Sequence, residues 1–499
     1  MNLFRAITQF FRPAVTKFRQ YEAALTNRLT GAWNAWLTNA NNELRLSQRI
    51  LRNRVRDRER NDAWTARLFD ILEQEVVGAE GVTFQSKAVT PRGRDDVKKR
   101  TIIETAWNKW CESVTPDGMS MTASLWLILR SIMRDGECFI VLRTIDEQLQ
   151  LQLLESDYCD ELQGGDFPMG IKVNQYGKPE AYSFYERHPG SLEGGGAKYQ
   201  ISANDVLHPA YKTRIGQLRG VPKIAPALMR TWQLGKYEEA ELISARQQAC
   251  AGVFFKKTLP EGWTGDPVDG DVGQIGVVTE PGQGIELPYG VEAQVYNPTH
   301  PHSNYTAFTQ AQLRALAVCG GVSFHVLSGD LTSVNYSSAR IGYLSDQSGW
   351  KMLQELLISR VLEPVFNRWL ETEIAFGRLP VAFSLPNARA HTWHPKRWVW
   401  VDPQAEAAGL SAMLENRLMS PQQAIASGGR DPDEVLRECA AWSAKLDALG
   451  VTGGPATTFG PAKPDLAPLP DTQGDGDDED GEPDLYAPEE IETETEDAA

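Results

Sequence analysis

The chain has 499 residues, 41% of them hydrophobic, so it is long enough for about three domains and apolar enough to fill their cores. No apolar run approaches the roughly 18 residues of a membrane-spanning helix, and residues 1–20 lack the continuous apolar core of a secretion signal. Six widely spaced cysteines without a CxxC pair favour buried thiols in a reducing compartment over disulfides or zinc ligands. These features predict a soluble, folded protein that is neither exported nor inserted in a membrane.

The net charge of −16 is concentrated at the C-terminus. Residues 464–499 carry 15 Asp and Glu and no Lys or Arg, which leaves 51 acidic and 50 basic residues elsewhere. Such a composition cannot bury enough apolar surface to order itself, so we expect residues 451–499 to form a disordered acidic tail. Its run Asp477–Asp480 has the charge to mimic DNA or to bind a basic partner, although most such tails only keep a protein soluble.

Residues 1–60 form a basic N-terminal arm, with 12 Lys and Arg against four acidic residues. Arginines occupy every second position from Arg52 to Arg60. On a helix this spacing would spread positive charge around all sides, and on a strand it would form a one-sided stripe. A contact with nucleic acid or with a scaffold is one interpretation, but a solvated surface helix or a mobile arm is favoured.

Helices precede strands in the first half of the chain. Asn61 and Asp62 can cap a helix that ends at Gly78, and two more helices are expected over 101–114 and 121–134, the last one closed by Gly136. The apolar period then shortens to two residues, which indicates a small antiparallel β unit. Its strands are expected at 137–143, 148–154, 170–173, 181–185 and 206–208.

A break between two helical stretches organises the second half. Residues 322–336 lose the helical period, and Ser328-Gly329-Asp330 is the expected reversal. The period resumes over 337–375, which predicts a helix of about 58 Å at ~1.5 Å per residue, kinked at Pro364. The remaining expected elements are helices at 224–251, 305–317, 403–416, 420–427 and 433–449, and strands at 275–278 and 291–295 within a Gly-, Pro- and Asp-rich insertion. The predicted fold class is therefore α+β and mainly helical.

Motifs for catalysis are missing from the sequence. It holds no GxxxxGK[ST] phosphate loop and no GxSxG nucleophile elbow. His391 and His394 form an HxxH pair without a glutamate partner, which favours a structural pair over a metal site. Asp157, Asp160 and Glu161 cluster in a polar loop, where carboxylates usually only solvate the chain, so a metal-dependent nuclease is disfavoured. We predict no catalytic, metal or cofactor site, and no enzyme.

Several short motifs follow one another in a recognisable order. They are Arg52-Asn-Arg54, Glu75-Val-Val-Gly78, Arg134-Asp-Gly-Glu137, Leu153-Leu-Glu-Ser-Asp157, Asp205-Val-Leu-His208, Arg214-Ile-Gly-Gln217, Arg219-Gly-Val-Pro222, Tyr336-Ser-Ser-Ala-Arg340 and Asp402-Pro403. Each alone is weak, but together the chain resembles the lambda-type family of phage portal proteins. The resemblance covers roughly residues 45–440 and leaves the N-terminal arm and the acidic tail outside it.

This resemblance implies a ring, typically of about twelve subunits, at one vertex of the capsid. Such a portal, assembled in the host cytoplasm, is the virion's conduit for double-stranded DNA during packaging and ejection. Its implied partners are terminase, the major capsid or scaffold protein, and a head-completion or neck adaptor. The implied parts are a wing (61–222), stem helices (223–251 and 304–321), a clip (252–303), a channel loop (322–336), a long wing helix with the segment after it (337–399) and a helical crown (400–450).

The channel loop is the candidate DNA contact. Strong phosphate pairing would hinder sliding, because each neutralised phosphate adds affinity. The loop carries Asp330 and His325 but no Lys or Arg, so we expect weak, non-specific contact. The residues expected nearest to DNA are Ser328, Gly329, Asp330, Thr332, Ser333 and Asn335. The alternative is a loop that only packs between subunits.

Two other classes of function stay open at this point. A neck or tail adaptor, or a minor capsid protein, would also be a soluble oligomer, although it hardly needs so long a helix behind an unstructured loop. A DNA-processing enzyme subunit, such as a nuclease or ATPase, would reveal itself by metal-dependent cleavage or nucleotide turnover. Ring geometry and channel size separate a portal from an adaptor.

Overall fold

The computed structural model describes residues 37–90, 92, 96–249, 253–257, 291–295, 305–332, 334–379, 385–398, 403–428, 430 and 432–449. The expected tail at 451–499, the strand at 275–278 and residues 1–36 of the arm lie outside these ranges. The chain divides into two units between Pro432 and Asp433, and helix α14 (Pro432–Ala448) is the described element of the second. The described residues are mainly helical with small antiparallel sheets, as the sequence predicts.

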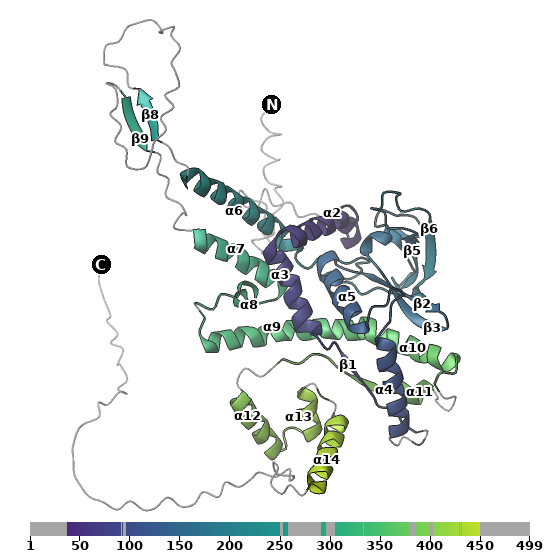
Figure 1. Ribbon diagram of the computed structural model, residues 1–499. Coiled ribbons are helices and arrows are strands. Elements are labelled where there is room, and N and C mark those ends of the chain that lie inside the picture. Colours follow the sequence, from purple (N-terminus) through teal and green to yellow (C-terminus); the bar gives the residue numbers. More distant parts are fainter. Residues whose placement is uncertain are drawn as a thin grey trace, which may run out of the picture. The chain divides into compact units, whose positions relative to one another are not determined.

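Four α-helices and a π-helical segment open the first unit (Figure 1). They are α2 (Ala40–Asn61), α3 (Ala63–Leu72), the π-helical η2 (Glu73–Val77), α4 (Val97–Cys111) and α5 (Met121–Asp135). The Asp62 side chain caps α3 by accepting from the Thr65 amide, and Gly136 ends α5 with φ 92°. The predicted helix boundaries here are thus confirmed to within a few residues.

The sheets formed by the described residues are antiparallel and have two or three strands. Their members are β3-β2-β7 (Gln148–Leu154, Phe139–Ile145, Val206–Leu207), β4-β5-β6 (Ile171–Val173, Pro179–Tyr185, Lys198–Ser202), β1-β10 (Thr83–Ser86, His391–His394) and β8-β9 (Val253–Lys257, Val291–Val295). The sequence patterns predict β2 to β5, β7 and β9, but not β1, β6, β8 or β10. Single-turn 3-10 helices lie at η3 (Ser156–Tyr158), η4 (Pro168–Gly170), η5 (Ala203–Asp205) and η6 (Ala225–Ala227).

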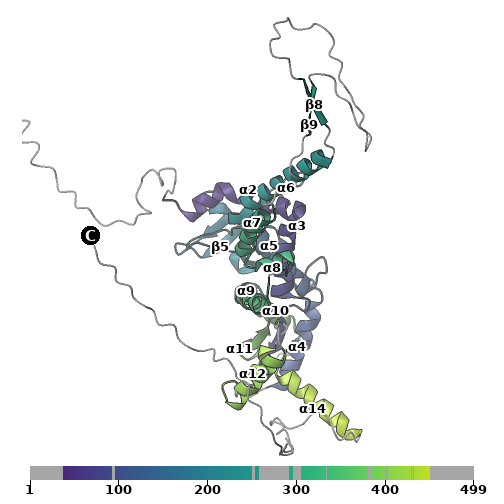
Figure 2. The ribbon, with the colours of Figure 1, turned by 90° about the vertical axis from the view of Figure 1, so that its left-hand side faces the viewer.

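Two helices that pack against each other lead to the long helix. Helix α6 (Leu228–Ala249) contacts α7 (Tyr305–Gly320), where Tyr237 stacks on Tyr305 and meets Phe308 edge-on. After the five-residue α8 (Phe324–Ser328), α9 (Tyr336–Leu357), η7 (Ile358–Leu362) and α10 (Glu363–Ala375) follow without a break. Figure 2 shows α9 and α10 nearly end-on, one behind the other. The predicted long helix is confirmed.

The distortion expected at Pro364 takes the form of the π-helical segment η7. Proline lacks the amide proton that an α-helix would use and clashes with the preceding turn. Pro364 therefore lies in the first turn of α10, and the five residues before Glu363 widen into a π-helix. The helix continues past the proline instead of ending there.

The core of the first unit is built from aromatic side chains of remote segments. Trp107 of α4 lies 5.4 Å from Phe366 and 5.1 Å from Trp369 of α10, between ring centroids, and 5.5 Å from Phe84 of β1. Strand β10 adds Trp393, 5.2 Å from Phe84. These contacts fasten the long helix to the β1-β10 sheet and to α4.

Short helices follow the long one. They are α11 (Leu385–Ala388), α12 (Pro403–Glu415) and α13 (Pro421–Ser427). Ser420 and Gln423 form a reciprocal capping box at the start of α13, with a proline at the first helical position, as the Ser-Pro sequence predicts. Among the residues that the structure describes, no helix combines the length and apolarity needed to cross a bilayer.

Candidate functional site

Several of the motifs that carry the family resemblance meet at one buried cluster of charges. Glu137, just before β2, and Arg219, in the loop before α6, are both fully buried, with 2.6 Å between Arg219 Nε and Glu137 Oε1. Arg219 also donates to the carbonyl oxygens of Cys159, Met169 and Ser156 at 2.9 to 3.0 Å. We call the group formed by Glu137, Arg219 and their partners the charged joint.

Glu137 has a partner on every side. Its carboxylate accepts from Gln48 Nε2 of α2 (2.9 Å), Ser156 Oγ (2.6 Å), the Gly220 amide (2.7 Å) and His208 Nε2 (2.8 Å). Burial alone would raise the pKa of Glu137, but Arg219 and His208 outweigh it and hold the pKa well below its ordinary value. The carboxylate therefore stays ionised inside the fold and ties four separate segments together.

Helix α2 brings a second layer of arginines to the same place. Arg52 is fully buried and donates to Asp157 Oδ1 at 2.7 Å and to Ser156 Oγ at 3.0 Å. Arg56 forms two parallel hydrogen bonds with Asp135, both 2.8 Å, and a 2.8 Å ion pair with Asp157. Planar guanidinium groups suit such bidentate pairing with carboxylates.

The expectation of a solvated surface helix or a mobile arm is therefore wrong for one face of α2. Residues 40–61 form a surface helix as expected, but its Arg52 and Arg56 point inward to carboxylates. The expectation that Asp157, Asp160 and Glu161 only solvate a loop is wrong as well. Asp157 pairs with Arg52 and Arg56, and Arg49 lies 2.5 Å from Glu161. Helical spacing alone cannot show which arginines have buried partners.

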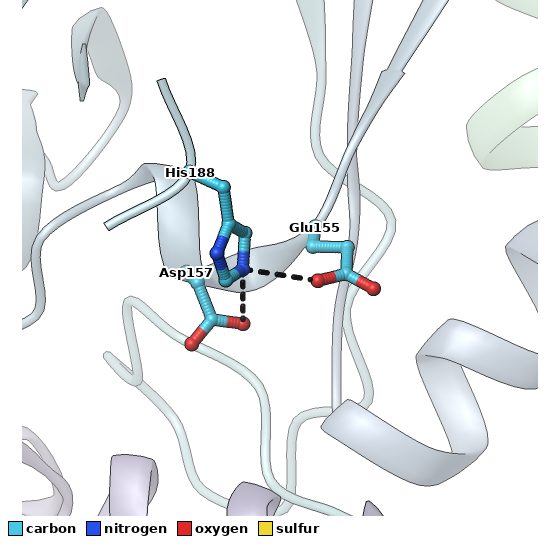
Figure 3. A group of neighbouring side chains, drawn as sticks. All are labelled: Glu155, Asp157 and His188. Atoms are coloured by element: carbon cyan, nitrogen blue, oxygen red, sulfur yellow. Dashed lines mark ion pairs between the residues drawn. The ribbon is translucent and has the colours of Figure 1, made fainter. Parts of the chain in front are cut away.

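One group of three possible metal ligands occurs among the described residues, and Figure 3 draws it: Glu155, Asp157 and His188. His188 Nε2 lies 3.2 Å from Glu155 and 3.8 Å from Asp157. The Gly190 amide donates to His188 Nδ1 at 3.0 Å, so the neutral ring carries its proton on Nε2 and has no lone pair there for a metal. Arg56 already lies 2.8 Å from Asp157 and 3.4 Å from Glu155. The group is an extension of the charged joint.

The two histidines of the HxxH pair have separate partners. His391 Nε2 lies 3.0 Å from Glu363 of α10, while His394 Nε2 lies 3.2 Å from Gln85 of β1. Residues three apart on a strand point to opposite faces. The pair thus fastens β10 to two different elements.

Most of the predicted channel-loop residues are engaged within the loop itself. Ser328 donates to the Phe324 carbonyl at 2.8 Å and accepts from the Asp330 amide, and Gly329 ends α8 with φ 68°. Asp330 accepts from the Thr332 hydroxyl and amide, which lowers its pKa. Asn335 caps α9 by accepting from the Ser338 amide. The sixth predicted residue, Ser333, lies outside the described residues.

A half-buried hydrogen-bonded contact holds the base of this loop against the long helix. Asp346 of α9 accepts from the Ser323 amide at 2.7 Å, at the start of α8. Burial raises the pKa of Asp346 although the bonds from Ser323 lower it. The loop is thus attached at both ends to α9, and its tip is exposed to solvent, including the apolar Leu331, which is 64% exposed.

Comparison with known proteins gives consistent matches. Residues 26–354 match the family model described as phage portal protein, lambda family. The sequence motifs place the start of the resemblance near residue 45. The family match begins at residue 26, within the basic N-terminal arm, so the expected N-terminal boundary is wrong. A probable portal protein of Halomonas phage phiHAP-1 is 30% identical over 466 residues, which cover 88% of this chain and 89% of that protein.

Solved structures are similar at a lower level. The neck of an empty gene transfer agent particle, computed with C6 symmetry, matches with a TM-score of 0.44 at 13% identity, over 80% of this chain and 95% of that one. The neck of the native particle, computed with C12 symmetry, matches with a TM-score of 0.43 at 12% identity and the same coverage.

Proposed function

Because the chain belongs to the lambda family of phage portal proteins, we propose that it assembles into a closed ring of about twelve copies. The ring occupies one vertex of the capsid and conducts double-stranded DNA, without sequence preference, during packaging and ejection. Its partners are terminase, the major capsid or scaffold protein and a head-completion adaptor, and it assembles in the host cytoplasm. The family is structural and not enzymatic, which sets aside a nuclease or ATPase subunit.

The order and length of the described elements support an assignment of the parts of such a subunit. We assign the wing to 61–222 together with α2, the stem to α6 and α7, the channel loop to 322–336, the long wing helix to α9, η7 and α10, and the crown to 400–450. The clip would comprise 252–303, of which β8 and β9 are described. The charged joint fixes the loop from which α6 departs, so it supports a stem held at a set angle to the wing.

The exposed helical pair α6 and α7 carries the ring proposal. None of residues 235–246 of α6 and none of residues 305–312 of α7 is buried. Leu242 and Ile243 point about 100° apart on the helix, and they are 53% and 46% exposed. Two different sides of α6 therefore expose an apolar side chain. Most helical stability in proteins comes from packing, and two helices that touch on one side provide little of it. Copies of the same pair on both sides would supply the missing contacts.

The chemistry of the channel loop supports a DNA conduit. It contains no Lys or Arg. The hydroxyl of Ser328 and the carboxylate of Asp330 already have partners inside the loop, and the amide side chain of Asn335 caps α9. Such a surface offers phosphates few counter-charges, so DNA would not be held in place by counterion release.

Electron microscopy of the purified chain, with particle mass measured by mass photometry, tests the ring. We expect rings of about twelve copies with an axial channel. Leu242→Lys with Ile243→Lys should lower the particle mass to that of single subunits and leave the helical circular dichroism unchanged. Tyr176→Lys, at an 85% exposed turn far along the chain from the stem, should still form rings. A wild-type chain that stays monomeric when scaffold or capsid protein is added would overturn the proposal.

A further inference from the structure

An exposed apolar strip runs along α2 and continues onto the first turns of α6. Leu46, Ile50 and Arg54 follow one another at four-residue steps and so share one face of α2. The strip continues into a hollow of about 310 Å³ between the two helices, lined by Arg54, Asp57, Arg58, Leu228, Met229 and Trp232. Figures 1 and 2 both show α2 beside α6, and the two helices are in contact.

The apolar side chains of this strip are unusually accessible. Leu46 is 75% exposed, Ile50 50%, Met229 59% and Trp232 47%. Single exposed apolar residues are normal on protein surfaces, but two on one face of α2 and two at the neighbouring hollow, with a tryptophan beside arginines, have the composition of a binding hot spot. The hollow gives one inserted side chain of a partner a place to be buried.

Two guanidinium groups of the strip, Arg54 and Arg58, form no ion pair among the residues that the structure describes, although Arg58 offsets part of the rise in the pKa of Glu238 that burial causes. Arg58 lies over the backbone of Gly235, where an added Cβ would come within 3.4 Å of Nη1, and its Nε is buried without a hydrogen-bond acceptor. Arg54 is exposed and has no hydrogen bond or ion pair within the described residues. Arg49, Arg52 and Arg56 of the same helix all have carboxylate partners. The strip therefore offers the exposed guanidinium of Arg54 as a free donor for an anionic group, with Arg58 and the carboxylate of Asp57 beside it in the lining of the hollow.

We infer that this α2–α6 strip docks an acidic amphipathic helix of another protein. Apolar side chains at the usual three- and four-residue steps would cover Leu46, Ile50, Met229 and Trp232, and flanking carboxylates would accept from Arg54 and Arg58. The basic arm formed by residues 1–36 has the wrong charge for this role. Duplex DNA would meet two arginines but would bury none of the apolar side chains, so it is disfavoured as the occupant.

This inference goes beyond the ring and channel, because it concerns binding to the chain whatever its assembly state. The probe is a labelled 18-residue peptide of Leu and Glu with Leu at helical spacing, compared with a Leu and Lys peptide of the same pattern. Fluorescence anisotropy against the full chain should show the Leu–Glu peptide binding at least tenfold more tightly, with affinity falling as salt rises. The variant Arg54→Glu with Arg58→Glu should reverse the preference.

A matched control and a second variant keep the test decisive. Lys98→Glu with Lys172→Glu makes the same charge change at two exposed positions on α4 and β4 and should leave the preference intact. Met229→Gln should weaken both peptides about equally, because it removes apolar contact and no charge. Equal affinity for both peptides, or the same reversal in the control, would overturn the inference. Displacement of the Leu–Glu peptide by a 20-base-pair duplex would also overturn it and would assign the strip to DNA. A Met229→Gln variant that lowers the particle mass but not the peptide affinity would overturn it as well and would assign the strip to a second copy of the chain.

Discussion

Gly136 and Gly220 approach each other so closely that a Cβ atom on Gly220 would lie 1.9 Å from the Gly136 carbonyl oxygen. Gly136 ends α5, and Gly220 belongs to the loop that leads into α6, so the contact joins these two helices beside the charged joint. On either side of it, the Tyr211 amide donates to the Gly136 carbonyl at 2.7 Å and the Gly220 amide donates to Glu137. The glycines let two backbones meet where side chains would separate them.

Replacing Gly220 by alanine should therefore destabilise the first unit. The added methyl group overlaps a backbone oxygen that cannot move without breaking the hydrogen bond from Tyr211, and we expect a loss of about 2–4 kcal/mol, at or above the usual cost of overpacking. Gly349→Ala is the matched control. It lies in α9 with nothing within 4 Å of the new Cβ, and it should stabilise by about 0.5–1 kcal/mol. Thermal unfolding followed by circular dichroism measures both, and equal effects would contradict the close approach.

Removing the charge of Glu137 should cost more than removing that of an exposed glutamate. Glu137→Gln leaves the guanidinium of Arg219 buried without its counter-charge, and breaking a buried pair in this way typically costs about 3–5 kcal/mol. Glu43→Gln breaks the exposed pair with Arg214 and should hardly change stability. Urea denaturation of the two variants provides the comparison. Matching midpoints would show that the charged joint does not hold the fold together.

His208 should make the stability depend on pH below about 6.5, its ordinary value. Burial lowers the pKa of His208, although the hydrogen bond to Glu137 raises it. The folded chain therefore binds fewer protons than the unfolded chain as pH falls below this value, so the free energy of unfolding decreases in acid. Glu137 and Asp157, whose pKa values are lowered in the fold, add their own loss only below about pH 4.

The variant His208→Gln isolates this contribution. Its amide can still donate to Glu137 but cannot take up a proton, so the decrease in melting temperature from pH 7 to pH 5 should be smaller than in the wild-type chain. All other ionisable groups are the same in the two proteins, so their contributions cancel from the difference. Indistinguishable pH dependence would mean that His208 titrates alike in the folded and unfolded states.

Local sequence signals predict local structure well in this chain. Asp62, Ser120 and Ser420 are capping residues where the sequence places helix starts, and Gly136 ends a helix with the left-handed backbone expected of it. The long helix is also predicted, because its apolar side chains recur over many turns. Strand β1 is not predicted from the sequence, because it has only four residues and its pairing partner β10 lies more than 300 residues further along the chain.

The charged joint shows what a single sequence hides. Its motifs can be recognised in the sequence, but the sequence does not show which residues pair. Arg52 pairs with Asp157, which is 105 residues away, and Arg56 pairs with Asp135, which is 79 residues away. Five arginines at alternate positions look alike in the sequence, and the fold buries Arg52 while leaving Arg54 exposed. An arginine motif and a separate acidic motif in one chain are the signal that could have suggested the pairing.

A single lysine in the channel loop should turn a weak DNA contact into a strong one. Thr332 is exposed at the tip of the loop, next to Asp330, and a ring would repeat Thr332→Lys about twelve times around the proposed channel. Each phosphate that a lysine neutralises adds about 0.9 to the slope of log affinity against log salt, so the ring should bind duplex DNA more tightly and with a steeper salt dependence. DNA held in this way slides less easily, and packaging should slow in a terminase-driven assay.

The variant Tyr176→Lys carries the same change of charge at an exposed turn between β4 and β5, and it separates a channel effect from a general one. We expect its packaging rate and salt slope to equal those of the wild-type ring. Asp330→Lys with Ser333→Lys should slow packaging further than Thr332→Lys, because it adds two positive charges and removes one negative charge per subunit. If both loop variants package at the wild-type rate while their rings remain intact, residues 322–336 do not face the DNA, and the loop must pack between subunits instead.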